Sequence, residues 1–368
     1  MLIMFPIKHK FKNFSSTKIP KVLEINPLIF FTLLTGLILA FLLDLALGSV
    51  QIPIQQVVTI LLGGQAEKAT WTTIIFKFRL PKALTATFAG AALGVSGLQM
   101  QTLFRNPLAG PFVLGISSGA ALGVALVVLT ANITGVGVLF KDLGIIGDFS
   151  LVVAASLGAA LVLGLVLLVA RRVQDTMTLL ILGLLFGYAT SAVVSILLHF
   201  SETQQIQSYL QWTFGSFAGV TWRQMLVLAP VVLLALLISV MLSKPLNALL
   251  LGEAYARSLG LGVQQARFWI ITSASILAGA ITAFCGPIAF LGVAIPHLCR
   301  SLFNTSEHRV LIPAVIFMGA ISALIADLLS QLAVRQTILP LNSVTALIGT
   351  PVVTWVILRR NSRTSFPK

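Results

Sequence analysis

Nine apolar runs, each close to the length that crosses a lipid bilayer, dominate this sequence. A transmembrane helix needs about 20 consecutive apolar residues to span the hydrocarbon core. The chain of 368 residues is 57% hydrophobic and only 9% charged, whereas soluble domains carry about 25% charged residues. This composition excludes a soluble globular fold and a disordered chain. The runs lie near residues 28–47, 82–104, 112–131, 149–170, 178–200, 224–243, 266–285, 310–330 and 344–358.

A shorter run, 286–303, adds a further helix to this pattern. Gly286-Pro287 opens the run and Pro296 interrupts it, so we expect a short or broken helix whose backbone groups are satisfied by neighbouring helices. The sequence therefore predicts an all-α integral membrane protein of about ten transmembrane helices. The first run is too long for a signal peptide, so we read it as an uncleaved helix. The predicted domains are a basic cytoplasmic tail over 1–27, a transmembrane domain over 28–358 and a cytoplasmic tail over 359–368.

The distribution of basic residues predicts the orientation in the membrane. With the N-terminal tail inside and the helices alternating, 17 of the 24 Lys and Arg residues fall on the inner side and 7 on the outer side. Cytoplasmic loops of membrane proteins carry an excess of Lys and Arg, so both termini are predicted to be cytoplasmic. The formal net charge of +14 then belongs to short loops, which disfavours nucleic acid as a partner.

The stretch Arg79–Ala121 distinguishes this chain from a simple membrane anchor. It carries small residues where a lipid-facing helix would carry Leu, and it breaks at Arg105-Asn106-Pro107 and at Gly110-Pro111. Small residues let helices approach closely. A polar break at membrane depth is tolerated only inside protein or beside a water-filled path. The pattern favours a protein that moves something across the membrane.

A second interrupted segment echoes the first. Residues 110–115 (GPFVLG) resemble residues 286–292 (GPIAFLG), which have one extra residue. Pairs of Gly/Pro-interrupted segments are typical of transporters built from repeats. Two short matches in a glycine-rich chain also arise by chance, so both interpretations stay open.

The sequence carries no recognisable catalytic or cofactor motif. It has no His-Glu-x-x-His zinc pair, no Ser/His/Asp constellation and no P-loop. Cys285 and Cys299 lie in apolar runs without metal-ligand spacing, and we expect both to be small buried residues. We therefore expect no enzyme activity, no metal and no cofactor on this chain. If ATP drives transport, a separate subunit must hydrolyse it.

Two acidic residues lie inside apolar runs, where an ionisable group is functional by default. Asp44 is expected at the outer membrane interface, with a functional role as the alternative. Asp327 is deeper, and it either pairs with a neighbouring helix dipole or polar group or lines the pathway. Small polar residues near the inner breaks form a gate or simply cap helices. The pathway and gate candidates are Asn106, Pro107, Ser117, Ser118, Thr176, Thr178 and Asp327.

Several stretches together resemble the FecCD-type permease subunits of type II ABC importers, which take up ferric siderophores, haem and cobalamin. The resemblance implies ten helices per subunit, a second permease (another copy or a related chain), two ATPases and an extracytoplasmic binding protein, in the bacterial inner membrane. It implies an iron chelate as substrate, with a ferric siderophore first and haem or cobalamin as alternatives. The matching stretches are RLPK (79–82), 96–121, 212–222, 251–263, 286–300, 308–314, 326–327 and 339–352.

The long inner loop 244–262 reads as a short amphipathic helix that stops at Leu259-Gly260. By resemblance, it is the cytoplasmic loop that docks into a groove of the ATPase. The residues that match this coupling motif are Gly252, Glu253, Arg257, Leu259 and Gly260.

The resemblance also assigns basic residues on the outer side to docking of the binding protein. Arg79 and Lys82 match one such site, although Lys82 lacks the bidentate geometry of arginine. Arg335 lies near another site but is offset from it, with Gln331 at the aligned position.

The chain departs from the family pattern Glu-Leu-Pro-x-Gly, because Ile338 replaces the acid and Asn342 the glycine. Asparagine tolerates a positive φ, so the turn is expected to survive. The rival interpretation is an ion-driven secondary transporter in which Asp327 is the coupling acid.

Overall fold

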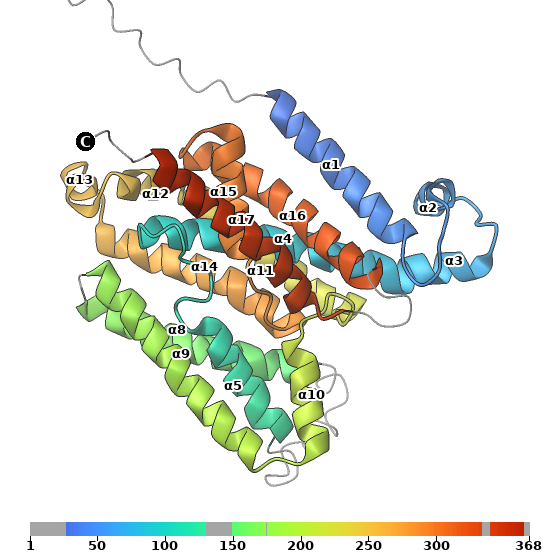
Figure 1. Ribbon diagram of the computed structural model, residues 1–368, viewed down its shortest axis with the longest axis horizontal. Coiled ribbons are helices and arrows are strands. Elements are labelled where there is room, and N and C mark those ends of the chain that lie inside the picture. Colours follow the sequence, from blue (N-terminus) through green and yellow to red (C-terminus); the bar gives the residue numbers. More distant parts are fainter. Residues whose placement is uncertain (1–26, 130–148, 174, 333–338, 364–368) are drawn as a thin grey trace, which may run out of the picture.

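The computed structural model describes residues 27–129, 149–173, 175–332 and 339–363, and within these ranges the chain is helical without any strand. The basic tail, Arg335 and Ile338 lie outside the described residues. Among the described residues, nine long and mainly apolar helices precede the final helix (Figure 1). They are α1 (Pro27–Ala46), α4 (Leu80–Leu103), α5 (Ile116–Leu129), α8 (Ser150–Arg172), α9 (Thr176–His199), α11 (Trp222–Met241), α14 (Val263–Cys285), α15 (Leu291–Phe303) and α16 (His308–Leu332).

The remaining elements lie mostly between these long helices. The final helix, α17, carries the last predicted run and ends in a basic segment. Short helices fill the predicted loops on both sides of the bundle. These elements are α2 (Ile54–Leu61), α3 (Ala69–Ile74), the π-helical turn η1 (Ile75–Arg79), α10 (Thr203–Thr213), α12 (Ser243–Leu250), α13 (Glu253–Ser258) and α17 (Leu341–Arg363).

Seven helices in the described part of the chain are long and apolar enough to cross a membrane. The helices α5 and α15 are apolar, and each begins after a Gly/Pro break that the sequence predicted; α15 is short, and the described part of α5 ends at Leu129, where the described residues stop. Helix α15 is short but continuous through Pro296. The multi-pass helical architecture is confirmed, whereas the count of about ten spans and the orientation of the termini stay predictions.

One predicted boundary is wrong. The second transmembrane helix was expected from residue 82, but a continuous helical span runs from Ala69 to Leu103. Lys77, Arg79 and Lys82 lowered the apparent hydropathy of its first turns. The chain remains helical there because Arg79 and Lys82 find partners inside the bundle, and Pro81 lies in the first turn of α4, where its missing N–H is tolerated.

Helix α4 is the centre of the first packing group, which also contains α1, α15 and α16 (Figure 1). Glycines allow this close packing. A Cβ atom on Gly90 would lie 2.0 Å from the carbonyl oxygen of Gly319, and one on Gly97 would lie 1.7 Å from that of Gly292. The small residues that the sequence singled out therefore bring helix backbones together.

A second group consists of α5, α8 and α9 and lies below the first in Figure 1. Here a Cβ atom on Gly158 would lie 2.0 Å from the carbonyl oxygen of Gly119. Helix α14 contacts both α4 and α8 and thereby joins the two groups.

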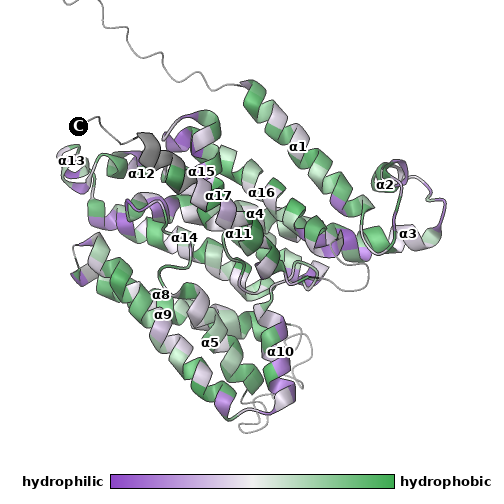
Figure 2. Cartoon of the chain, viewed as in Figure 1, coloured by the Kyte–Doolittle hydropathy of each residue, from purple (hydrophilic) through white to green (hydrophobic). Residues whose placement is uncertain are grey.

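Polar residues gather at the ends of the long helices and on α10 and α13, whereas the sides of the bundle are largely apolar (Figure 2). Such a distribution suits a bundle surrounded by lipid. It also separates two polar ends, one formed around α12 and α13 and the other around α2 and α3 (Figure 1).

Candidate functional site

The coupling motif forms a short helix, α13, that projects at one end of the bundle. Gly252 and Gly260 flank it with φ values of 108° and 82°, a region that L side chains rarely adopt. These two glycines let the chain turn sharply into and out of α13. Leu259, just after the helix, is 62% exposed, and Tyr255 within it is 51% exposed. Exposed apolar side chains on a polar end of the molecule are typical of a protein contact. The predicted stop at Leu259-Gly260 is confirmed, whereas the segment predicted as one short helix consists of two, α12 and α13, because the chain turns at Gly252 between them.

The acidic residue of the motif is held by two arginines. Oε1 of Glu253 lies 2.7 Å from Nη2 of Arg267, and its Oε2 lies 3.3 Å from Nη2 of Arg257. Arg267 belongs to α14 and is 3% exposed, whereas Arg257 faces solvent. A cavity of about 520 Å³ opens beside the pair and is lined by Arg257, Gly262, Val263, Gln264, Gln265 and Arg267.

Helix α12, which precedes α13, is tied to the first packing group through His308. The backbone N–H of His308 donates to Oδ1 of Asn247 at 2.9 Å, and Nδ1 of the ring lies 2.7 Å from the same oxygen. Nε2 lies 2.8 Å from Oγ1 of Thr102, near the end of α4. Asn247 also donates to Glu307. The sequence singled out His308 only as part of the family stretch 308–314. Its contacts could not be predicted, because a buried contact between distant segments has no local sequence pattern.

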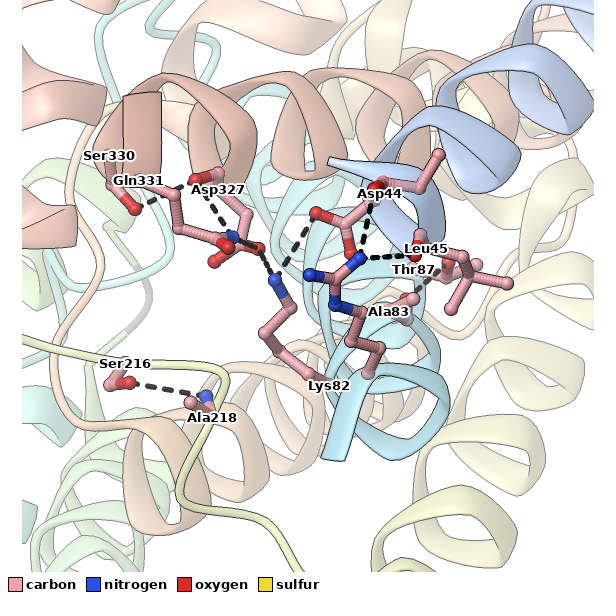
Figure 3. Close-up of polar contacts among 12 residues, drawn as sticks. Asp44, Leu45, Lys82, Ala83, Thr87, Ser216, Ala218, Asp327, Ser330 and Gln331 are labelled. Atoms are coloured by element: carbon pink, nitrogen blue, oxygen red, sulfur yellow. Dashed lines mark hydrogen bonds and ion pairs between the residues drawn. The ribbon is translucent and has the colours of Figure 1, made fainter. Parts of the chain in front are cut away.

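The opposite end of the bundle contains a buried ion cluster (Figure 3). Nζ of Lys82 lies 2.7 Å from Oδ2 of Asp327 and 3.4 Å from Oδ1 of Asp44. Gln331 donates to Oδ2 of Asp327 at 2.6 Å. The cluster joins α1, α4 and α16. Asp44 lies near the end of α1, as predicted, but it is fully buried and faces Lys82, so it does not reach toward water. For Asp327, the structure shows pairing with a neighbouring helix.

Arg79 closes the C-terminal end of α1. Its guanidinium donates to the carbonyl oxygens of Leu45 at 2.7 Å and Ala46 at 2.9 Å, and also to that of Val50. The last carbonyls of a helix have no partner within the helix, and a cation there is favoured by the helix dipole. Arg79 and Lys82 are therefore 7% and 8% exposed. Their role in docking a binding protein stays a prediction, and it would require these contacts to open.

The gate candidates lie on different elements and do not form one cluster. Asn106 and Pro107 follow the end of α4, where Oδ1 of Asn106 accepts from the Leu108 N–H at 2.9 Å and the Pro107 carbonyl lies 2.7 Å from Nε2 of His297. Ser117 and Ser118 lie in the first turn of α5. Asp327 lies apart from Asn106 and Pro107, because it contacts Lys82 in the first turn of α4 whereas those two residues follow its last turn.

Thr178 lies in the first turn of α9, where Asp175 is the N-cap residue. The Thr178 N–H and hydroxyl donate to Oδ2 of Asp175 at 2.8 Å and 2.7 Å. These hydrogen bonds, with a smaller contribution from the charge of Arg267, lower the pKa of Asp175. The side chain of Thr176 lies outside the described residues. The N-cap of this turn is therefore Asp175 and neither threonine, and a gate role for Thr176 and Thr178 stays a prediction.

Asn342 keeps the turn by hydrogen bonds and not, as the sequence had suggested, by adopting a positive φ. Positive φ values occur at Gly286 (75°) and Phe290 (66°) but not at Asn342, which lies in the first turn of α17. Its Oδ1 accepts from the N–H of Ala289 at 3.0 Å, and its own N–H donates to the Phe214 carbonyl at 3.0 Å. Asn342 thus fixes the turn before α15 by hydrogen bonds, which a glycine could not do through its side chain.

Comparisons with known proteins agree with this arrangement. The chain is 38% identical over 301 residues to the vitamin B12 import system permease protein BtuC of Klebsiella pneumoniae, covering 82% of this chain and 87% of that protein. The protein of the same name from Shigella sonnei is 37% identical over 288 residues, covering 77% and 83%.

A solved structure described as an inward-facing metal-chelate type ABC transporter superimposes with a TM-score of 0.79 at 29% identity. It covers 90% of this chain and 99% of the solved chain. The model of the FecCD transport family matches residues 36–359. The chain is therefore a member of the FecCD transport family, the permease subunits of ABC importers.

Proposed function

We propose that the chain forms half of the membrane path through which an ABC importer takes up a metal chelate. The observation that carries this proposal is α13, a short helix with exposed apolar residues that is held against a transmembrane bundle by the Glu253–Arg267 ion pair. Such a helix is suited to enter a groove on a separate ATPase. The end that carries α12 and α13 then faces the cytoplasm, and the end with α2 and α3 faces a substrate-binding protein.

The second permease, either another copy or a related chain, packs against α9 and α17 in this proposal. Both helices expose large apolar residues, such as Tyr188 at 72% and Leu347 at 75%. They also expose small polar residues, which suit a hydrated path more than lipid. The exposed polar residues on these helices include Thr178, Ser191, Ser195, Thr350 and Thr354.

Three metal chelates are candidates for the substrate. An iron chelate, above all a ferric siderophore, follows from the sequence resemblance to iron-uptake permeases. Cobalamin has a specific observation in its favour, since the two relatives above are named as vitamin B12 permeases and are 37–38% identical to this chain. Haem is a third metal chelate that the same machinery would accept. The shared chemistry is a large chelated metal handed over by a binding protein.

The test is uptake into liposomes that contain this chain and its ATPase, with ATP at the side of α13 and loaded binding protein at the other side. Radio-iron siderophore and radiolabelled cobalamin are compared in parallel. ATP-dependent accumulation of one chelate supports the proposal and identifies the class. Accumulation without any ATPase that is lost in Asp327→Asn would instead establish an ion-coupled secondary transporter.

A further inference from the structure

Arg267 lies where three segments of the chain meet. It belongs to the second turn of α14 and is 3% exposed. Nη2 contacts Oε1 of Glu253 in α13 at 2.7 Å, and Nη1 donates to the carbonyl oxygen of Val173 at 3.1 Å. Val173 follows α8, and α9 begins three residues later at Thr176. One buried guanidinium therefore joins the coupling helix to the α8–α9 turn.

The two ends of the α12–α13 segment are held by different packing groups. Asn247 in α12 is bonded to His308 in α16, which reaches Thr102 in α4. Glu253 in α13 is bonded to Arg267, which reaches the start of the second group at Val173. Gly252, at a φ of 108°, separates the two short helices, so the segment turns between its two attachments. Movement of α13 relative to α12 would then shift one group against the other.

We infer that Arg267 is a positioning residue that transmits movement of α13 to the α8–α9 turn, and so to the face of α9. This inference rests on the proposed function, because it gives α13 the role of the ATPase contact. The residue acts through Glu253 and Val173. It supplies a physical link between the coupling motif and the α9 end of the path.

Arginine suits this position for a geometric reason. Its planar guanidinium presents several N–H donors in a fixed fork, so it can hold a carboxylate and a carbonyl at once. A lysine is a single point charge on a flexible stem and would favour the carboxylate alone. The charge of Arg267 also acts on Asp175, the cap of α9, from the same side. Arg267→Lys should therefore keep the ion pair and weaken the link to the turn.

The experiment measures how accessible the first turn of α9 is in the assembled transporter. A Met177→Cys reporter, at a site that is 57% exposed, is labelled by a thiol reagent with and without a non-hydrolysable ATP analogue. The native Cys285 and Cys299 are 3% and 0% exposed and should stay unlabelled. The variants are Arg267→Met, Arg267→Lys and Glu253→Gln. The control is Arg309→Met, which removes an exposed arginine at the same end.

With Arg267 intact, nucleotide should change the labelling rate, and Arg309→Met should keep that change. Arg267→Met should abolish it and lower the number of chelate molecules carried per ATP hydrolysed, while the ATPase still co-purifies. Arg267→Lys should give an intermediate response. An undiminished nucleotide response in Arg267→Met overturns the inference. If Arg267→Met fails to accumulate in the membrane, Arg267→Lys takes its place in the test. A full nucleotide response of the labelling rate in Arg267→Lys also overturns the inference.

A failure of the proposed function would give a different result from a failure of the inference about Arg267. In that case the ATPase would not co-purify with the unsubstituted chain, and neither labelled chelate would accumulate. A chain that assembles with its ATPase and transports, but whose Arg267 variants respond normally, refutes only the inference about Arg267.

Discussion

Single charged residues decide how the bundle of this protein is held together. Lys82 and its two carboxylate partners lie almost wholly inside protein, and Arg79 beside them satisfies carbonyls at the end of α1. A buried charge is tolerated only when it is paired and hydrogen-bonded. Lys82 is the one cation that contacts both carboxylates, so its loss would leave Asp44 and Asp327 facing each other without it.

Replacing the central cation tests this dependence. Lys82→Met should destabilise the helix bundle by about 3–5 kcal/mol, because Asp44 and Asp327 would remain buried without their cation. The measurement is the thermal or denaturant midpoint of the protein in nanodiscs. Lys77→Met, which removes an exposed lysine from η1, is the control and should change the midpoint little.

A second variant separates charge from packing. Combining Lys82→Met with Asp44→Asn and Asp327→Asn removes all three charges at similar volume. It should recover most of the lost stability, since apolar or neutral replacement of a whole buried ion network is often close to neutral. Equal instability of the single and triple variants would show that the lysine stem, and not the ion pairing, matters there.

Helix pairs are set by glycines that allow backbones to touch. Along α4 and α16, Gly90 and Gly319 lie so close that neither has room for a methyl group. By contrast, a Cβ atom on Gly164 in α8 would meet nothing within 4 Å. The same residue type is therefore a packing requirement at one position and replaceable at another.

This contrast gives a matched pair of substitutions. Gly90→Ala should push α4 away from α16 and lower stability by about 1–3 kcal/mol, in the range of other overpacking changes. Gly164→Ala should be neutral or slightly stabilising, because alanine is the better helix former. Both are compared by their unfolding midpoints in nanodiscs. Equal effects of the two would exclude backbone contact as the reason for glycine at position 90.

At the scale of the whole molecule, the two polar ends differ in what they expose. The end with α13 presents Leu251, Tyr255 and Leu259, which are 64%, 51% and 62% exposed. These residues lie on a segment that both packing groups hold. The arrangement suits an element that receives force from a partner and passes it to the bundle.

Leu259→Glu tests the partner contact. A carboxylate in an apolar groove would be desolvated without a partner, so affinity for the ATPase should fall at least about tenfold, or ~1.4 kcal/mol. The measurement is retention of the ATPase on the purified permease. Leu62→Glu, at a residue that is 82% exposed on the opposite end, should leave retention unchanged. Normal retention in Leu259→Glu would remove this residue from the proposed contact surface.

The sequence by itself determined the class of architecture and the position of its breaks. Apolar runs of spanning length fix where helices cross a bilayer, because no other local structure satisfies the backbone there. The breaks after Leu103 and Cys285 and the stop at Gly260 were also readable, since glycine and proline act on the chain locally. The family motif placed the coupling segment for the same reason, as it is contiguous in sequence.

Only the tertiary structure decided which polar residues meet. The contacts Lys82–Asp44, Asn247–His308 and Arg267–Val173 join segments 38, 61 and 94 residues apart, and no periodicity records such a pairing. Hydropathy placed Arg79 before the second helix and Lys82 at its first residue, because a hydropathy scale treats every charged side chain as exposed, including one that has a buried partner. A charged side chain can be buried only when it has such a partner, and packing of the whole bundle places the partner beside it.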